Sequence, residues 1–176
     1  ADRLIDDLDE TDYLPHIKTS QINYVGRSYG VEVDFQIKQG GNIKIFTTCI
    51  ETIFGCTFVV LAPEHPLLKT LQPHIKNWDA VQKYCQQASR KSEFERSQMV
   101  KDKNGCCLEG VTAINPVNGR EVAVYIADFV LCNYGTGAVM AVPTHDQRDY
   151  EFAVKHNIPM IQVISGKIDD CALEKA

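Results

Sequence analysis

The sequence predicts a β-barrel-like core of mostly antiparallel strands with peripheral helices, an α+β fold in a single domain of 176 residues. Two hairpin patterns carry this prediction. Apolar and polar residues alternate from Val31 to Ile37, and Gly40-Gly41-Asn42 supplies a turn before a second apolar run. Farther on, Asn118-Gly119 joins two more strands, because Asn-Gly accepts the positive φ of tight hairpin turns. A hydrophobic content of 44% is enough for one core and excludes intrinsic disorder.

The first half of the chain alternates short helices with these strands. Residues 2–9 predict one or two helical turns, which Pro15 interrupts before the β-rich stretch begins. Residues 58–62 are wholly apolar and predict a buried strand, after which a helix begins near Leu67. The first hairpin therefore lies between two helical segments.

The second half begins with a polar stretch. Residues 77–100 contain neither Gly nor Pro, which predicts one or two surface helices that Gly105 ends. After the second hairpin, apolar runs predict strands at 129–131 and 138–142, separated by a glycine-punctuated bend.

A last helix and a last strand complete the fold. Thr144 is a good N-cap, and Gln147 three residues later completes a capping box. The helix is expected to run to about His156, with Asn157 ending it, and residues 160–164 predict the final strand.

Charge and cysteine content exclude several classes of function. The chain has 18 Lys and Arg against 23 Asp and Glu, so no basic surface extends over it and any nucleic-acid contact must be local. Its seven cysteines form no C-x-x-C pair, which favours free thiols in a reducing compartment. No apolar run approaches the ~20 residues of a membrane span, so we expect a soluble chain. An opening without Met or a signal-peptide profile indicates a processed or excised piece.

Three threonines, Thr47, Thr48 and Thr52, follow the second predicted strand. A strand end is where a sheet presents a site. Threonine hydroxyls hold a water or an oxyanion, and the β-branched side chain is a stiff steric wall. The strand propensity of threonine explains the same residues without any function.

Two carboxylates, Asp146 and Asp149, lie three residues apart on one face of the last predicted helix. Asp146 falls in the first turn, where the helix dipole alone accounts for an anion. Asp149 is expected past that turn and suits an ammonium group, the alternative being an ion pair with Arg148 or a lysine. His145-Asp146 also fits a metal-dependent hydrolase, although a catalytic zinc site takes about three protein ligands and the chain has no H-x-x-x-H pair.

Together, these segments resemble the editing domain of bacterial leucyl-tRNA synthetase, the insertion called connective peptide 1. Gly135–Pro143 followed by His145–Ala153 is close to the family's signature, and Thr47–Gly55 resembles its threonine-rich peptide. The resemblance covers nearly the whole chain. It implies the class I aminoacyl-tRNA synthetase editing-domain fold, with residues 1–25 and 165–176 as linkers to the rest of a synthetase.

The chain departs from the family within the threonine-rich peptide. The bacterial pattern is Thr-Thr-Arg-Pro-Asp-Thr, whereas Cys49, Ile50 and Glu51 stand here in place of Arg, Pro and Asp. A guanidinium and a locked φ are lost, which changes the loop's charge and preorganisation. The synthetase's ATP-site signatures are absent, so this chain does not itself activate leucine.

The resemblance implies post-transfer editing, which hydrolyses the ester of tRNA(Leu) mischarged with isoleucine, valine, norvaline or methionine and spares leucyl-tRNA(Leu). One methylene is worth about 1–3 kcal/mol in a binding pocket, so a second site must remove the wrong product. By resemblance Asp149 binds the α-ammonium group. Thr47 and Thr48 are catalytic residues that hydrogen-bond the water and the oxyanion, and Thr52 is the steric gate against leucine.

The resemblance also implies two further groups of substrate-binding residues, which line the amino-acid pocket and contact the terminal adenosine. They are Met140 and Val142 for the pocket, and Leu131, Tyr134, Asp146 and Arg148 for the adenosine. No metal or other cofactor is expected here, because ATP and Mg belong to the synthetic domain outside this chain.

The expected partners are the 3′-terminal adenosine of tRNA(Leu) and the rest of the synthetase, with no membrane. The isolated domain is expected to be a monomer, in the cytoplasm or an organellar matrix. Two alternatives to the editing deacylase stay open. They are an editing-deficient module that binds the tRNA 3′ end, and a metal-dependent hydrolase.

Overall fold

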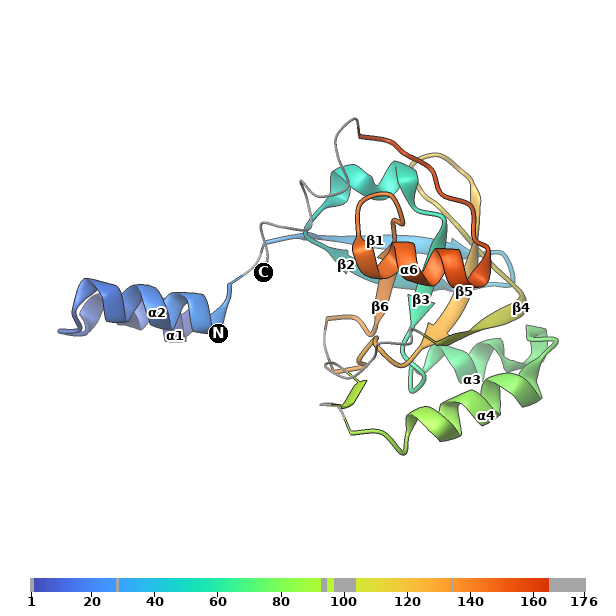
Figure 1. The fold of residues 1–176 in the computed structure, drawn as a ribbon, viewed down its shortest axis with the longest axis horizontal. Helices are drawn as coiled ribbons and strands as arrows, with labels where there is room; N and C mark the ends of the chain where they lie inside the picture. The colour runs from blue at the N-terminus through green and yellow to red at the C-terminus, as the bar shows by residue number, and fades with distance from the viewer. Residues whose placement is uncertain (1, 28, 93–94, 97–103, 134, 165–176) are drawn as a thin grey trace. The chain divides into compact units, whose positions relative to one another are not determined.

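The computed structural model describes residues 2–27, 29–92, 95–96, 104–133 and 135–164. The chain divides into two compact units, one of residues 1–30 and one from residue 31 onward. Figure 1 draws the helices and strands of each unit. No helix within the described residues is long and apolar enough to cross a membrane.

The first unit is helical. α1 (Asp2–Asp6) runs into the 3₁₀ turn η1 (Asp7–Glu10), and α2 (Pro15–Val25) follows. The first helical turns are confirmed, whereas α2 replaces the β-rich stretch expected directly after Pro15. Proline fits the first position of a helix, where its missing N–H costs no hydrogen bond. Gly26 then ends α2 in the left-handed conformation, with a φ of 63°.

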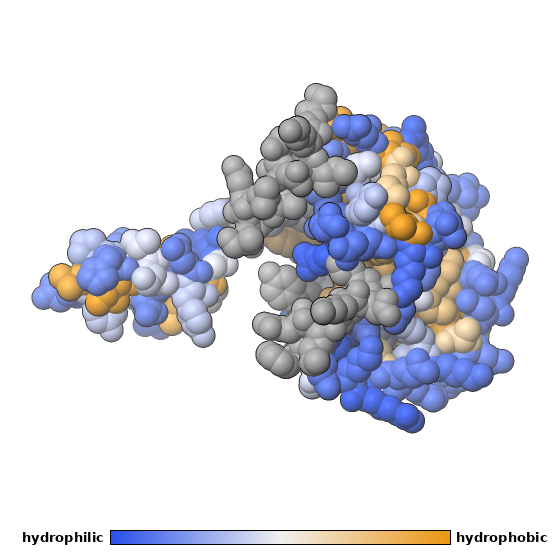
Figure 2. Space-filling view, viewed as in Figure 1, coloured by the Kyte–Doolittle hydropathy of each residue, from blue (hydrophilic) through white to orange (hydrophobic). Residues whose placement is uncertain are grey.

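Apolar side chains remain exposed on this helical unit, as the orange patches of Figure 2 show. The exposed large apolar residues of the unit are Leu4, Tyr13, Leu14, Ile17, Ile22, Tyr24 and Tyr29. Among its described residues only Leu8 is buried. Most of the described part of residues 1–25, expected to be a linker, therefore forms helices that bury little apolar surface.

The second unit is built on one six-stranded sheet with the order β2-β1-β4-β5-β3-β6. The strands are β1 (Val31–Ile37), β2 (Asn42–Thr47), β3 (Phe58–Leu61), β4 (Gly105–Ile114), β5 (Glu121–Ala127) and β6 (Ala138–Ala141). The prediction of mostly antiparallel pairing is confirmed, since only β3 and β5 pair in parallel. The edge strands β2 and β6 approach each other, but no ladder joins them in the described residues. The barrel-like sheet is therefore not closed.

Helices of the second unit lie outside this sheet. They are η2 (Ile50–Gly55), α3 (Leu67–Leu71), η3 (Gln72–His74), α4 (Trp78–Ala88) and α6 (Gln147–His156). The helix expected near Leu67 and one of those expected within 77–100 are confirmed. The end of that predicted helical stretch, residues 97–100, lies outside the described residues.

β3 is buried on both faces, which explains its uninterrupted apolar sequence. Val59 and Leu61 belong to the larger core, together with Leu68 of α3. Phe58 belongs to a second core and stacks on Phe152 of α6, with the ring centroids 5.2 Å apart. α6 therefore packs against the opposite face of the sheet, across which Figure 1 shows it.

Gly105 begins β4, at a position where a Cβ would lie 2.6 Å from the Phe152 ring and only glycine allows that approach. The end of the helix that was expected to stop before Gly105 falls on residues 97–103, outside the described residues.

One sequence prediction about a strand is wrong in this unit. Residues 129–131 form no strand. A turn follows β5 instead, and Val130 donates its N–H to the Ala127 carbonyl.

The end of the chain also differs from the prediction. Residues 160–164 are not a strand, and the side chains of Met160 and Val163 are exposed. Thr144 does not cap α6, because its hydroxyl donates to the Ile161 carbonyl at 2.9 Å. The helix begins two residues later than a Thr144 cap predicts, with Asp146 as its N-cap.

Candidate functional site

A pocket of about 430 Å³ lies where the ends of β2 and β6 meet the start of α6. Three short segments supply its walls. Its lining residues are Thr47, Thr48, Cys49, Thr52, Met140, Val142, His145, Asp146, Gln147, Arg148 and Asp149. The walls therefore combine hydroxyl groups and carboxylates with an apolar portion.

Hydrogen bonds within the chain fix the threonine segment. Thr47 is the last residue of β2, and its hydroxyl accepts the Cys49 N–H at 3.1 Å, which turns the chain out of the strand. The Thr52 hydroxyl donates to the Cys49 carbonyl at 2.9 Å. Thr52 is only 5% exposed, so its branched side chain is held as a rigid part of the pocket wall.

Asp146 organises the start of α6. Its Oδ1 accepts the N–H groups of Arg148 at 2.8 Å and Asp149 at 3.1 Å, the pattern of a helix N-cap. The carbonyl of Val142 accepts the N–H of Asp146 at 3.1 Å, which ties the cap to the end of β6. Arg148 Nε lies 3.9 Å from Asp146 Oδ1, but both side chains are exposed and the pair is weak.

Asp149 occupies the centre of this arrangement. Its Oδ2 accepts the Val142 N–H at 2.8 Å, which joins the first turn of α6 directly to the end of β6. Because α6 begins at Gln147, Asp149 lies within the first turn, and the prediction that it lies beyond it is wrong. Both the N–H donor and the helix dipole stabilise its ionised form.

A buried thiol lies near Asp149. Burial, with a smaller contribution from the Asp149 charge, raises the pKa of the Cys56 thiol to about 12. The Cys56 thiol donates to the Phe58 carbonyl at 3.3 Å. Cys56 therefore remains protonated and packs as a small apolar residue beside the pocket.

The described part of the chain contains no group of three or more His, Cys, Asp and Glu side chains placed to hold a metal ion. His145 and Asp146, the pair considered for a metal-dependent hydrolase, both line the pocket. Asp146 Oδ1 is engaged by the two amides of α6.

Comparison with known proteins gives a consistent result. A family model described as "Leucyl-tRNA synthetase, editing domain" matches residues 22–176. A leucine–tRNA ligase of Alkaliphilus oremlandii is 49% identical over 173 residues, which are 98% of this chain and 22% of that protein. A leucine–tRNA ligase of Chlorobium phaeobacteroides is 47% identical over 180 residues, which cover 99% of this chain and 21% of that protein.

The chain belongs to the leucyl-tRNA synthetase editing-domain family.

Structural comparison supports the same family. A crystal structure of the ternary complex of an Agrobacterium radiobacter LeuRS with tRNA and LeuAMS matches with a TM-score of 0.77 and 36% sequence identity. The match covers 93% of this chain and 20% of that chain. This editing domain thus spans about a fifth of the length of the curated relatives that it matches.

The pocket of the editing domain brings together most of the site residues expected from the sequence. They are Thr47, Thr48, Thr52, Met140, Val142, Asp146, Arg148 and Asp149. Leu131 is not among the lining residues, and Tyr134 lies outside the described residues.

Cys49 and Gln147 also line the pocket but were not expected as site residues, and His145, which was considered only for the metal-dependent hydrolase, lines it too. The sequence did contain a signal for them. Each lies inside one of the two motifs and directly neighbours a predicted site residue.

Proposed function

We propose that this editing domain hydrolyses the aminoacyl ester of mischarged tRNA(Leu) and spares leucyl-tRNA(Leu). The observation that carries the proposal is the single pocket that Asp149 shares with Thr47, Thr48 and Thr52, which lie about a hundred residues earlier in the chain. A carboxylate, hydroxyl groups and an apolar wall are what a small aliphatic aminoacyl ester requires.

Recognition of the amino acid is assigned to the α6 side of the pocket. The ionised Asp149 carboxylate, held in place by the Val142 N–H, pairs with the substrate's α-ammonium group. Met140 and Val142 contribute the apolar surface for the aliphatic side chain. Together they orient the ester carbonyl toward the threonine segment.

Hydrolysis is assigned to the threonine segment. The oxygen of a water attacks the ester carbonyl carbon, the bond from that carbon to the ribose oxygen breaks, and the proton that the water gives up ends on the ribose oxygen. Thr47 and Thr48 hydrogen-bond the water and the developing oxyanion. An aminoacyl ester is already activated, so positioning and electrostatics suffice without a dedicated general base, and the vicinal ribose hydroxyl assists.

Selectivity against leucine is assigned to Thr52. Its side chain is nearly buried and is fixed by the hydrogen bond to Cys49, so it cannot move aside for a larger substrate. Leucine branches at its γ-carbon and meets this wall, whereas isoleucine and valine branch one carbon earlier.

The tRNA partner is assigned to the exposed side of the same pocket. Asp146 and Arg148 are partly or fully exposed at the start of α6 and line the pocket, which supports assigning them the contact with the terminal adenosine. The matched LeuRS structure contains tRNA, and its chain is about five times longer than this editing domain. We propose that the remainder of such a synthetase holds the tRNA body.

The test is a deacylation assay with isoleucyl-tRNA(Leu) and leucyl-tRNA(Leu) as substrates. It compares the 176-residue chain with a full-length ligase that carries this sequence. We expect the isoleucyl ester to be hydrolysed and the leucyl ester to survive, with no effect of a chelator. Activity that disappears with chelator and returns with zinc supports the metal-dependent hydrolase instead.

A second candidate is a module that binds the tRNA 3′ end without hydrolysing it. The observation in its favour is that Cys49 lines the pocket at a place where the bacterial pattern has arginine, with Ile50 starting η2 in place of proline. The double variant Cys49→Arg, Ile50→Pro separates the two candidates. An inactive parent whose double variant gains hydrolysis supports the binding module.

A further inference from the structure

The turn between β4 and β5 carries a buried asparagine that reaches η2, the segment that contains Thr52. Asn115 is completely buried, with an exposed fraction of 0%. Its Nδ2 donates to the Ile53 carbonyl at 2.7 Å, and its Oδ1 accepts the Val117 N–H at 3.1 Å. Because one partner is an acceptor and the other a donor, the amide is fixed in a single orientation.

The turn that carries Asn115 is itself closed by hydrogen bonds. The Asn115 N–H donates to the Arg120 carbonyl, and the Asn115 carbonyl accepts the Gly119 N–H, both at 2.9 Å. Asn118 binds the Arg120 N–H through Oδ1 at 3.0 Å and reaches η2 through Nδ2, which donates to the Phe54 carbonyl at 3.3 Å. The turn is therefore a stiff support that directs two amide groups at consecutive carbonyls of η2.

The carbonyl that Asn115 binds belongs to the residue directly after Thr52. Within this part of the chain, the Cys56 N–H donates to the Ile53 carbonyl at 3.1 Å, and the Thr52 hydroxyl donates to the Cys49 carbonyl at 2.9 Å. These local bonds fix the shape of the segment and would move with it. The bond from Asn115 comes from a distant part of the chain, so it fixes where the segment lies.

η2 also packs against another part of the pocket wall. A Cβ on Gly55 would lie 3.2 Å from Val142 Cγ1 and 2.9 Å from the Ile161 carbonyl. Val142 and Thr52 both line the pocket. A shift of η2 therefore changes the position of Thr52 relative to Val142, and with it the room that the pocket offers to an aliphatic side chain.

We propose that Asn115 is a positioning residue for selectivity against leucine. Its amide holds η2 from the β4–β5 turn and thereby keeps the Thr52 side chain where it excludes the larger substrate. The inference rests on the proposed deacylase function and deepens it. Asn115 is not among the residues that line the pocket, so it acts through η2.

A separate hydrogen-bond network, at the opposite end of β6, supplies a control for general loss of stability. Gly137 directly precedes β6, and a Cβ on it would lie 3.2 Å from the His65 ring. Glu64, next to His65, pairs with the buried Arg96, whose Nε donates to the Asp128 carbonyl at 2.6 Å. The four residues of β6 extend over about 13 Å at about 3.3 Å per residue, which separates this network from the pocket.

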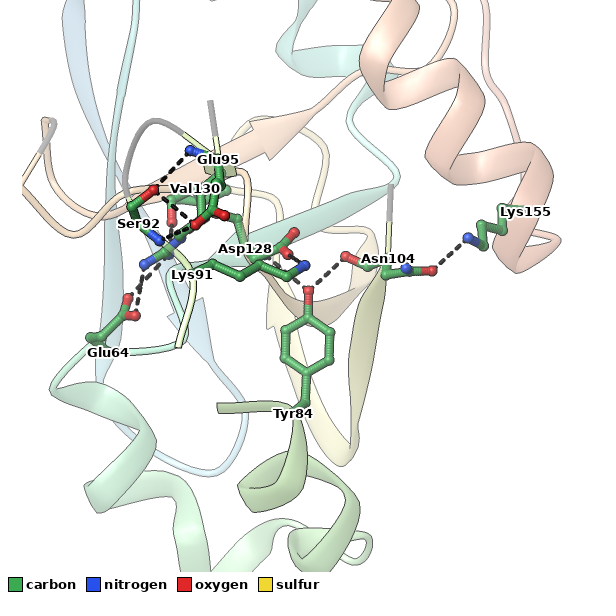
Figure 3. Close-up of polar contacts among 10 residues, drawn as sticks. Glu64, Tyr84, Lys91, Ser92, Glu95, Asn104, Asp128, Val130 and Lys155 are labelled. Carbon is green, nitrogen blue, oxygen red and sulfur yellow. Dashed lines mark hydrogen bonds and ion pairs between the residues drawn. The ribbon is translucent and has the colours of Figure 1, made fainter. Parts of the chain in front are cut away.

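Tyr84 belongs to this separate network, as Figure 3 shows. Its hydroxyl accepts the Asp128 N–H at 3.0 Å and donates to the Asn104 carbonyl at 2.7 Å. Tyr84→Phe removes both hydrogen bonds and therefore lowers stability without reaching η2.

The test compares Asn115→Ser with Asn118→Ser and Tyr84→Phe in the 176-residue chain. A serine hydroxyl at position 115 can still accept the Val117 N–H, but it is too short to reach the Ile53 carbonyl. Asn118→Ser makes the same exchange on the exposed side of the turn, where water replaces the lost hydrogen bond. The readouts are kcat/KM for leucyl-tRNA(Leu) and for isoleucyl-tRNA(Leu).

We expect Asn115→Ser to raise kcat/KM for leucyl-tRNA(Leu) about three- to tenfold and to change the value for isoleucyl-tRNA(Leu) less than about twofold. Both controls should change the ratio of the two values less than about twofold. In a Thr52→Ala background, Asn115→Ser should have no further effect on leucine, because the wall that it positions is gone.

Hydrogen–deuterium exchange gives a readout that does not depend on activity. In Asn115→Ser, residues 50–56 should exchange at least about fivefold faster than in the parent, while β3 and α6 exchange at the parent rate. In Tyr84→Phe, residues 50–56 should exchange at the parent rate.

A folded Asn115→Ser protein that spares leucine as well as the parent overturns the inference, as does an undiminished effect in the Thr52→Ala background. If Asn115→Ser does not unfold cooperatively, Asn115→Thr replaces it, since threonine keeps the hydroxyl and fills more of the space, and the same outcomes decide. A parent protein without deacylase activity contradicts the proposed function instead. In that case equal exchange of residues 50–56 in parent and variant overturns the role of Asn115.

Discussion

The two ends of β6 differ in how their polar side chains are used. At the C-terminal end, polar side chains line the pocket, whereas at the N-terminal end they pack around the buried guanidinium of Arg96. In the pocket, Asp149 uses one oxygen to bind the Val142 N–H and remains half-buried beside open space. At the other end, the guanidinium of Arg96 makes four hydrogen bonds within the protein and is almost excluded from solvent.

The difference teaches which groups are suited to substrate and which to structure. A polar group that faces a hollow can exchange water for a ligand. A buried group with all its hydrogen bonds made gains nothing from a ligand but loses stability when a partner is removed. Substitutions in the pocket should therefore change activity more than stability. Substitutions around Arg96 should change stability more than activity and leave kcat nearly intact.

The largest effect is expected at Asp149. Asp149→Asn removes the charge but keeps an oxygen that accepts the Val142 N–H. Deacylation of isoleucyl-tRNA(Leu) should fall at least about 100-fold, because loss of one well-placed electrostatic contact costs about that much. The free energy of unfolding should change by less than about 1 kcal/mol, the usual size of a helix-dipole contribution. Single-turnover deacylation and urea unfolding measure the two quantities.

Asp149→Ala is the matched variant. It removes the acceptor as well, so the Val142 N–H is left without this partner and unfolding should become easier by about 1–3 kcal/mol. Near-normal hydrolysis by a folded Asp149→Asn protein contradicts the assigned role. Equal stability of the two variants contradicts the structural role of the Val142 hydrogen bond.

The second effect is a gain of activity at Thr52. Thr52→Ala opens the wall and should increase hydrolysis of leucyl-tRNA(Leu) by about 10- to 100-fold, since such a wall contributes about 1–3 kcal/mol of discrimination. Thr52→Val keeps the branched shape while losing the hydrogen bond to Cys49, so it should still protect leucine. The rate of leucyl-tRNA(Leu) deacylation by the two variants shows whether Thr52 is the wall. If leucine stays protected in Thr52→Ala, the wall lies at Met140 or Val142.

The two ends of β6 also differ in how much the sequence reveals of them. Thr47 and Asp149 could be selected because each lies in a local motif whose chemistry and family resemblance are readable. The turn around Val130 could not be predicted, because its carbonyl is bound by Arg96, 34 residues earlier in the chain. An apolar run there predicts a strand, and only the distant guanidinium explains the turn.

The same limit applies to the fold. The two hairpins were predictable, because strand alternation and the Asn-Gly turn are local properties. The need for glycine at position 105 was not, since it arises from the close approach of Phe152 from α6. Helix α2 was missed for a local reason, because Pro15 is compatible both with a break and with the first position of a helix.

A third, smaller effect is expected at Tyr84, which supports the buried end. Tyr84→Phe removes the hydrogen bonds to Asp128 and Asn104 and should lower stability by about 1–2 kcal/mol, or about 3–6 °C in Tm. Well below the Tm, kcat for deacylation should stay within about twofold. Tyr24→Phe is the control, because Tyr24 is 90% exposed. A fall in kcat without a fall in Tm contradicts the division between the two ends.

The smallest effect is a pH dependence at the N-terminal end of β6. Burial lowers the pKa of His65, whose Nδ1 accepts the Leu67 N–H at 3.2 Å. The folded protein therefore binds its proton less readily than the unfolded chain, in which the pKa is about 6.5. The stability that neutral His65 contributes is complete above that value and is lost as the pH falls through the lower pKa of the folded state.

His65→Asn tests this contribution, because asparagine offers an oxygen near the position of Nδ1 and does not titrate. Between pH 7.5 and pH 5 the Tm of the parent should fall further than that of the variant, by no more than the ~2–4 °C that about 1 kcal/mol produces in a chain of this size. Burial also lowers the pKa of His156, but that residue is present in both proteins, so the difference isolates His65. Equal falls in Tm would show that the turn beside Gly137 does not depend on a neutral imidazole. The pH sensitivity would then have to come from the α6 side of the sheet, where His156 lies.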